Sequence, residues 1–443
     1  MTKSPQRVRP LEIGGHSTPS PVRGALNAPS FRWARCTSEI AGRPRALVWK
    51  GLVSAVCVFV ALGSCKRADP TTTIKGTARI PESTRVAVLS AFATCAASEA
   101  RAFRDAAAAF EQASMTASSS KTSESKIIAQ DAWRSAIDIW ERNELLQFGP
   151  SAIKSQPGGQ DQRENIYPWP LTNRCLLEQQ IVSKGYESSG FGSLLTSYRG
   201  LGAAEYLLFY EGTDNACGEG ATINAQKTWE AVGADLGARK LDYAKAIATD
   251  VHTHADALAT TWDPEKGNFG RNLSDAGIGS SVYSSQQLAF NVVSDALFYV
   301  ETDVKDMKVG RPTGLTDCST PTCPEALESL YAKRSKAHVK NNLVGFRNLM
   351  FGCEGDGKGL GFDDLLVAIG AESVATRLKS ALDASFAALD AIQSDDFSQA
   401  LGSELDKMKA LHAALIGITD LLRTEFITVL DLELPKRVEG DND

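Results

Sequence analysis

The last apolar stripe of the chain is the feature that most limits its fold. Between residues 401 and 426, apolar or weakly polar side chains recur at alternating steps of four and three. Because an α-helix has about 3.6 residues per turn, this spacing places them all on one face. A helix with a continuous apolar face needs partners, so the stripe predicts a helical bundle. Its members are Leu401, Leu405, Met408, His412, Leu415, Thr419, Leu422 and Phe426.

Similar periodicity predicts helices along most of the chain, and no alternating strand pattern of useful length occurs. In the first half we expect helices from Val88 to Phe110, from Trp133 to about Phe148, and over about 192–210 and 224–262. In the second half we expect four helical runs, over about 284–308, 324–351, 362–393 and 398–432.

A polar, glycine-rich segment at 263–281 separates these two groups of helices and reads as a linker. We therefore expect an all-α protein of two four-helix bundles. The first bundle covers 81–262, the second covers 282–435, and a tail covers 436–443.

The N-terminal region has the parts of a bacterial lipoprotein signal. Basic residues precede an apolar run at 51–62, and the small residues Gly63 and Ser64 then lead to Cys65. We expect residues 1–64 to be an N-terminal extension plus signal peptide, Cys65 to be lipidated, and 65–80 to be a tether. The alternative is a buried helix that ends in a cysteine. Lys66 after the cysteine favours the outer membrane, facing the periplasm, by analogy with the enteric sorting rule.

Charge and cysteine content agree with an envelope protein. Removing residues 1–64 leaves 38 basic and 51 acidic residues, a net charge near −13. Such an acidic body argues against a nucleic-acid partner. Six cysteines follow Cys65, which permits three disulfides in an oxidising compartment. Cys318 and Cys323 are the easiest pair to assign, and a disulfide there is favoured over a metal site because no second close cysteine pair exists.

Common catalytic motifs are absent from the sequence. It contains no His-Glu-x-x-His, no Gly-x-Ser-x-Gly and no phosphate-binding loop. His252 and His254 are two residues apart on a predicted helix and face different directions. His412 lies on the apolar stripe and reads as a core histidine, and His338 belongs to no recognisable motif.

Five blocks of sequence, in order along the chain, resemble the imelysin family, also called insulin-cleaving membrane proteases. Each block alone is weak, but together they span nearly all of the chain after the signal. They are 132–150, including Trp133, Trp140 and Glu141; Trp169-Pro170-Leu171; Gly200–Phe209; 297–312; and Asn342–Leu349.

The resemblance implies a bacterial envelope protein of two helical bundles related by duplication, with a Gly-x-His-x-x-Glu motif near the groove between them. The family's name associates its members with peptidase activity, and relatives of the family associate it with the uptake of iron or other metals. Aligned through Gly200 and Glu205, the motif histidine is replaced by Gly202. Since a catalytic metal site usually needs three protein ligands, the surviving Glu205 alone does not supply one.

Several residues are candidates for binding a ligand or a metal in that groove. Glu205 is the candidate metal ligand, or alternatively a buried carboxylate paired with Arg347. The arginine is itself a candidate anion-binding residue, with an ordinary salt bridge as the alternative. For Trp140 and Trp169 the alternative is a role in the core. Asn342 can instead cap a kink or face solvent. The full candidate set is Gly200, Gly202, Glu205, Trp140, Trp169, Asn342 and Arg347.

The sequence therefore predicts a non-catalytic binding or accessory protein of the cell envelope, anchored to the membrane by lipid and linked to iron or metal-complex uptake. Its partner is a small ligand, a metal complex or an envelope protein, and its cofactor is unidentified, with a divalent metal or iron as candidates. One alternative is a metal-dependent peptidase that uses Glu205, Glu144 and a histidine from elsewhere. Another is a structural envelope protein with a vestigial site.

Overall fold

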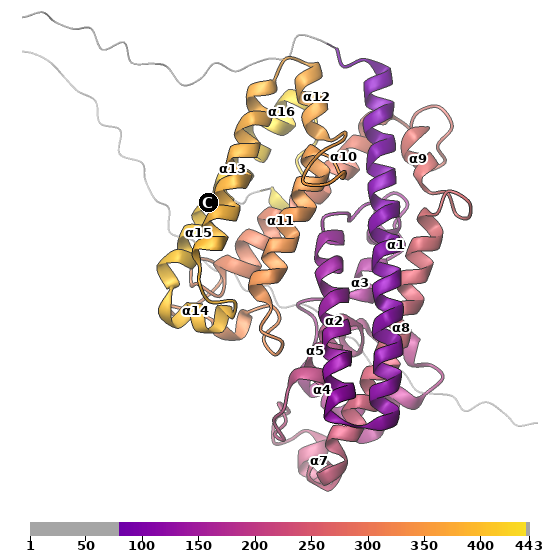
Figure 1. Ribbon diagram of the computed structural model, residues 1–443, viewed down its shortest axis with the longest axis vertical. Coiled ribbons are helices and arrows are strands. Elements are labelled where there is room, and N and C mark those ends of the chain that lie inside the picture. Colours follow the sequence, from indigo (N-terminus) through magenta and orange to yellow (C-terminus); the bar gives the residue numbers. More distant parts are fainter. Residues whose placement is uncertain (1–78, 440–443) are drawn as a thin grey trace, which may run out of the picture. The chain divides into compact units, whose positions relative to one another are not determined.

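The structure is a computed structural model that describes residues 79–439, all within one compact unit (Figure 1). The predicted signal peptide, the predicted lipidation site Cys65 and nearly all of the predicted tether lie outside the described residues.

The longest helix organises the first half of the molecule. Helix α1 (Glu82–Ser120) buries an apolar face that includes Phe92, Phe103 and Phe110. This face packs on α2 (Ser123–Asn143) and α8 (Leu236–Trp262). By length and composition α1 is the one helix within 79–439 able to cross a membrane, but a core helix satisfies the same criteria.

Between α2 and α8 the chain is less regular than the sequence predicts. The expected helix over 192–210 is correct only from Gly200 onward. Residues 191–198 instead form two short 3₁₀ turns, in a segment rich in Ser, Thr and Gly. The helices of this region are α3 (Gln162–Ile166), α4 (Arg174–Ser183), α5 (Gly200–Phe209), α6 (Thr222–Ala225) and α7 (Thr228–Val232).

The second half also consists of helices, some of them interrupted. It comprises α9 (Gly270–Ser274), α10 (Gln286–Leu297), the π-helical segment Val300–Gly310, α11 (Ser335–Phe351), α12 (Phe362–Ala368), α13 (Glu372–Ala391), α14 (Phe397–Ser403), α15 (Leu405–Leu421), the π-helical segment Leu422–Phe426 and α16 (Ile427–Leu430).

Three of the expected helical runs there are wrong in part. The run over 398–432 is interrupted at Glu404, so Leu401 lies on α14 and the rest of the predicted apolar stripe begins on α15. The run over 324–351 becomes a helix only at Ser335, because residues 324–334 form a 3₁₀ turn followed by a loop. The run over 362–393 is divided in two at Gly370, whose φ of +79° is left-handed.

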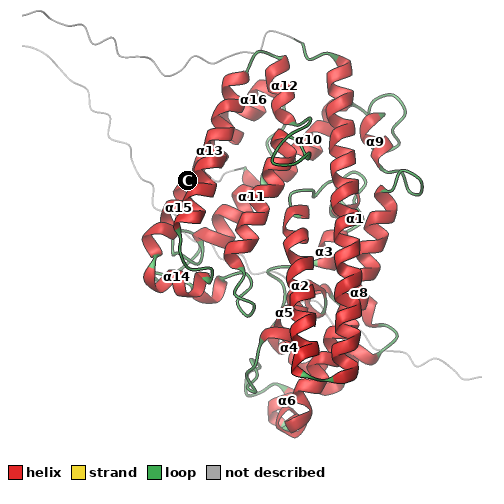
Figure 2. Ribbon diagram, viewed as in Figure 1, coloured by secondary structure: helices red, strands yellow, loops and turns green. Residues whose placement is uncertain are grey.

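The all-α prediction is confirmed, since residues 79–439 contain helices and one isolated bridge but no strand (Figure 2). The predicted linker at 263–281 contains the short helix α9, which packs on α1. The predicted domain boundaries and the duplication stay predictions.

Contacts between the two halves chiefly involve α1 and α2 of the first half. Helix α11 packs on α2, and α1 contacts both α10 and α12. A disulfide between Cys95 on α1 and Cys353, just after α11, adds a covalent link. The other two disulfides join Cys175 to Cys217 and Cys318 to Cys323.

Candidate functional site

The first turn of α5 is shaped by a glycine that no other residue can replace without strain. Gly200 has a φ of +81°, in the left-handed region. A Cβ atom there would lie 2.7 Å from the carbonyl oxygen of Ile166 and 2.7 Å from Cδ of Pro168. The conformation of Gly200 therefore lets α5 start directly against the 166–168 segment and fixes the position of the residues that follow.

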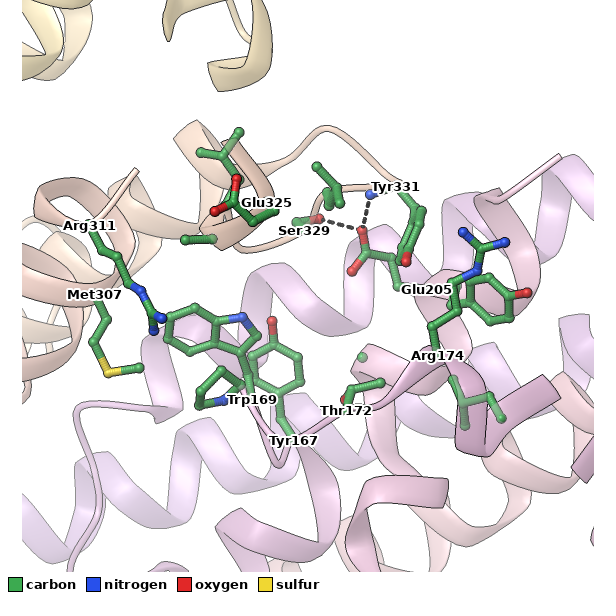
Figure 3. A pocket seen from close by; sticks show the side chains of 17 residues that line it. Tyr167, Trp169, Thr172, Arg174, Glu205, Met307, Arg311, Glu325, Ser329 and Tyr331 are labelled. Atoms are coloured by element: carbon green, nitrogen blue, oxygen red, sulfur yellow. Dashed lines mark hydrogen bonds between the residues drawn. The ribbon is translucent and has the colours of Figure 1, made fainter. Parts of the chain in front are cut away.

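Glu205, one turn further along α5, holds the loop before α11. Its Oε1 accepts hydrogen bonds from the backbone N–H groups of Tyr331 (2.9 Å) and Ala332 (2.8 Å) and from the hydroxyl of Ser329 (3.2 Å). Figure 3 shows the other carboxylate oxygen on the side of Tyr167. Burial raises the pKa of Glu205, although these hydrogen bonds oppose the rise.

A cavity of about 320 Å³ opens beside Glu205 (Figure 3). It lies between the 167–177 segment and α5 on one side and residues 307–331 on the other. Gly202 lines it, and a Cβ at this position would lie 2.8 Å from Oγ1 of Thr172. That hydroxyl is buried and has no hydrogen-bond partner among residues 79–439. The side chain of Thr172 therefore lies close to the backbone where the motif histidine of the family resemblance would begin, and its hydroxyl is left unsatisfied.

One cationic side chain of the cavity has no ion-pair partner among the described residues. Arg311 is exposed, and its guanidinium has no hydrogen bond or ion pair within residues 79–439. Figure 3 shows this group next to the half-buried indole of Trp169. Arg174, also in the lining, differs because it pairs with Glu178 (2.6 Å) and Asp214 (2.8 Å). Arg311 and Trp169 therefore form the part of the cavity that is free to bind an anionic or planar group.

A fully buried ionic cluster lies behind this cavity. The ammonium group of Lys308 contacts Oε2 of Glu141 (2.6 Å) and Oε1 of Glu328 (3.0 Å), and all three side chains are completely buried. Lys308 also donates to Oδ1 of Asn342 (2.9 Å), and Nδ2 of Asn342 donates to Glu141. Tyr167 belongs to both regions, because it lines the cavity and its hydroxyl donates to Glu328 (3.0 Å).

Burial and charge change the pKa values of this cluster in opposite directions. Burial and the neighbouring Glu328 raise the pKa of Glu141 to about 7. Burial also acts to raise the pKa of Glu328, but Lys308 and His338 outweigh it and lower that pKa to about 2. Burial acts to lower the pKa of Lys308, yet the carboxylates raise it, so the lysine is a permanent cation.

The structure places three of the predicted site residues, Gly202, Glu205 and Trp169, in the cavity lining. Gly200 lies at the start of the same helix. Asn342 lies in the buried cluster behind the cavity.

Trp140 and Arg347 lie elsewhere. The indole N–H of Trp140 donates to Glu144 (2.5 Å), and its ring packs on Phe103 in the core. Arg347 pairs with Asp356 (3.3 Å) and not with Glu205. Glu144 is likewise occupied, by Trp140, Gln147 and Arg163.

Sequence reasoning missed Lys308, Glu328 and His338. His338 and Asn342 are four residues apart on α11, and Glu141 and Glu144 are three apart on α2, so each pair shares a helix face. Those spacings were the available signal. They were not distinctive, because charged pairs at such spacings are common on exposed helices.

The comparisons with known proteins identify the class. The family model described as imelysin (peptidase M75) matches residues 96–424, and the chain belongs to this family.

A curated relative, iron-regulated protein A of Synechococcus elongatus, is 25% identical over 255 residues, which is 57% of this chain. The chain spans 60% of the length of that relative.

Two crystal structures show the same fold. A candidate iron-regulated protein A precursor from Parabacteroides distasonis superposes with a TM-score of 0.61 at 18% identity, covering 80% of this chain and 97% of the other. An imelysin-like protein from Psychrobacter arcticum gives a TM-score of 0.60 at 16% identity, covering 81% and 99% respectively.

Proposed function

We propose that this protein is a non-catalytic binding protein of the cell envelope, linked to iron acquisition, and that its cavity binds a small carboxylate chelate of a metal. The observation that carries the proposal is the cavity next to Gly202 and Glu205, with the unpaired Arg311 and the indole of Trp169 in its lining. A volume of about 320 Å³ suits a small ligand.

The chemistry of the lining supports binding over catalysis. A catalytic metal usually has three protein ligands and one open position. The lining contains two carboxylates, Glu205 and Glu325, and no histidine or cysteine. One oxygen of Glu205 is already used by three hydrogen bonds to the 329–332 turn. The lining therefore favours recognition of a ligand that brings its own metal coordination.

The envelope location rests on the sequence before residue 79 and on the family. The basic flank, apolar run and Cys65 support lipid anchoring, and the name of the Synechococcus relative supports a link to iron. Incorporation of labelled fatty acid in bacteria that express the chain, and its loss in Cys65→Ala, would test the anchor.

Ligand binding is tested by titrating the purified full-length protein with ferric citrate and following both heat and melting temperature. We expect saturable binding that weakens about ten-fold or more in Arg311→Met and in Trp169→Ala. Arg271→Met, which removes an exposed arginine from α9, is the matched control and retains binding. Absence of binding to ferric citrate and to free citrate would remove the proposal. Chelator-sensitive peptide cleavage that is lost in Glu205→Gln would favour the peptidase instead.

A further inference from the structure

The carboxylates of the buried cluster each use only one oxygen on Lys308. The remaining oxygens, Oε1 of Glu141 and Oε2 of Glu328, both face Nδ1 of His338 at 3.1 Å. These three atoms come from α2, from the loop before α11 and from α11 itself. Three separate parts of the fold therefore bring one ligand atom each to a common point.

None of the three atoms has a well-aligned hydrogen-bond partner within residues 79–439, and their contacts with one another are ion-pair contacts. The ion-pair distances are short, but the atoms lack hydrogen-bond alignment with one another. His338 Nε2 is also unpartnered, and all three side chains are completely buried. Since unpaired buried polar atoms are costly and rare, such a group needs an occupant or a specific role.

We propose that Glu141 Oε1, Glu328 Oε2 and His338 Nδ1 bind a divalent transition-metal ion. Ligand atoms bound about 2.1 Å from one ion at tetrahedral to octahedral angles lie about 3.0–3.4 Å apart. The two 3.1 Å distances to Nδ1 fall within this range. One imidazole nitrogen with two carboxylate oxygens suits Zn²⁺ or Fe²⁺, whereas Ca²⁺ and Mg²⁺ prefer oxygen alone.

The surrounding residues already hold the ligands in place. Lys308 fixes the far oxygen of each carboxylate, Tyr167 donates to Glu328, and Asn342 donates to Glu141. Outer contacts of this kind orient metal ligands and raise affinity. Lys308 also offsets one of the two negative charges, which leaves a net charge of about −1 for the incoming ion if His338 is neutral.

This site is distinct from the ligand cavity and does not depend on the proposed function. Tyr167 separates them, with its ring in the cavity lining and its hydroxyl on Glu328. Glu205 belongs to the cavity and not to the three-atom group. A metal at the buried site would brace α2 against α11 and the preceding loop.

The test uses full-length protein without a histidine tag, stripped with a chelator and dialysed against Zn²⁺, or against Fe²⁺ without oxygen. We expect one ion per chain and X-ray absorption that shows one imidazole with oxygen ligands. His338→Asn should weaken binding at least about 100-fold while keeping a polar group beside the carboxylates. His254→Asn, a change to another histidine that pairs with a carboxylate, is the matched control. Glu205→Gln should keep the ion even if it loses ferric citrate.

Three results would overturn the site. Wild-type protein that binds neither ion would show that the cluster is only an internal salt-bridge network. Equal binding by His338→Asn would place the metal elsewhere. If His338→Asn does not fold, the absorption spectrum of the wild-type protein decides, and a spectrum without imidazole rejects the proposal.

Discussion

The cavity and the buried cluster are neighbours, but their cationic side chains differ in whether they have ion-pair partners. In the cavity, Arg311 has no protein partner within residues 79–439, and a buried hydroxyl, that of Thr172, is unsatisfied. In the cluster, Lys308 is surrounded by two carboxylates and an amide oxygen and has no exposure at all. An unpaired charge at a surface hollow suits a visiting ligand, whereas the buried ion pairs of the cluster hold α2 to the loop before α11. The comparison therefore separates a region open to ligands from one whose ion pairs stabilise the fold with or without a bound ion, and each prediction below tests that separation.

Removing the buried cation should have the largest effect. Lys308→Met leaves Glu141 and Glu328 buried without their counter-charge, so we expect the free energy of unfolding to fall by about 3–5 kcal/mol. Urea denaturation of the metal-free protein measures it. Lys126→Met removes a solvent-exposed ion pair with Glu211 and should cost about 1 kcal/mol or less. Equal losses in the two variants would contradict the contrast between internal and surface charge.

Truncating Glu205 should lower the free energy of unfolding by less than the loss of Lys308 does. Glu205→Ala leaves the N–H groups of Tyr331 and Ala332 without their acceptor, and we expect a loss of about 2–3 kcal/mol. Hydrogen exchange should accelerate in the 329–332 turn and remain slow in α2. If α2 exchanges equally fast, the cavity and the cluster unfold as one unit and the separation between them fails.

Two glycines on α5 test how much room the protein has for a side chain at each position, because alanine at each should change stability by a different amount. Gly200→Ala meets a left-handed φ, and its Cβ would lie 2.7 Å from the backbone oxygen of Ile166 and from Cδ of Pro168, so a loss of about 2 kcal/mol in the free energy of unfolding is expected. Gly202→Ala meets only the movable side chain of Thr172, and the helix propensity of alanine offsets the crowding to within about 1 kcal/mol. Thermal unfolding measures both. Similar losses would show that position 202 is not free space.

The smallest expected effect is the pH dependence of stability. It can be compared for two carboxylates that have similar hydrogen-bond partners. Glu205 and Glu404 each accept two backbone N–H bonds, but burial raises the pKa of Glu205, whereas the hydrogen bonds of the more exposed Glu404 lower its pKa to about 2. A raised carboxyl pKa favours the folded state at low pH, and this stability is lost as pH rises above about 4.5. A lowered pKa gives stability that is present above about 4.5 and is lost as pH falls toward 2.

Subtracting the stability of Glu205→Gln from that of the wild type should therefore give a difference that decreases from pH 4 to pH 7. The same subtraction for Glu404→Gln should give a difference that increases over that interval. If both stability differences change in the same direction between pH 4 and pH 7, burial does not give the two carboxylates opposite effects on stability.

The helical periodicity was enough to predict the fold class, because apolar stripes such as that at 401–426 reflect burial directly. Helix starts were less predictable. Residues 324–334 have helix-compatible composition, but their conformation is set by tertiary contacts, including the hydrogen bonds from Tyr331 and Ala332 to Glu205. A periodic pattern carries no information about a partner more than 100 residues away.

The same limit explains the outcome for the site. Gly202 and Glu205 were found through a motif and Trp169 through another block of the family resemblance, and all three line one cavity. Lys308, Glu328 and His338 meet only after distant segments fold together, so the local spacing of His338 and Asn342 could not show that they form one cluster. Trp140 shows the reverse case, since its block resembles the family but its side chain is a core residue.

The bond between Cys95 and Cys353 also sets an order of events during synthesis. Its cysteines are 258 residues apart, whereas the other pairs are 42 and 5 apart. A ribosome must therefore deliver every helix from α1 to α11 before this crosslink can close, and both shorter loops are complete by then. Oxidation that proceeds in step with emergence gives Cys95 four wrong partners, Cys175, Cys217, Cys318 and Cys323, before Cys353 exists. Correct maturation thus requires the short pairs to form promptly or an isomerase to rearrange early mistakes.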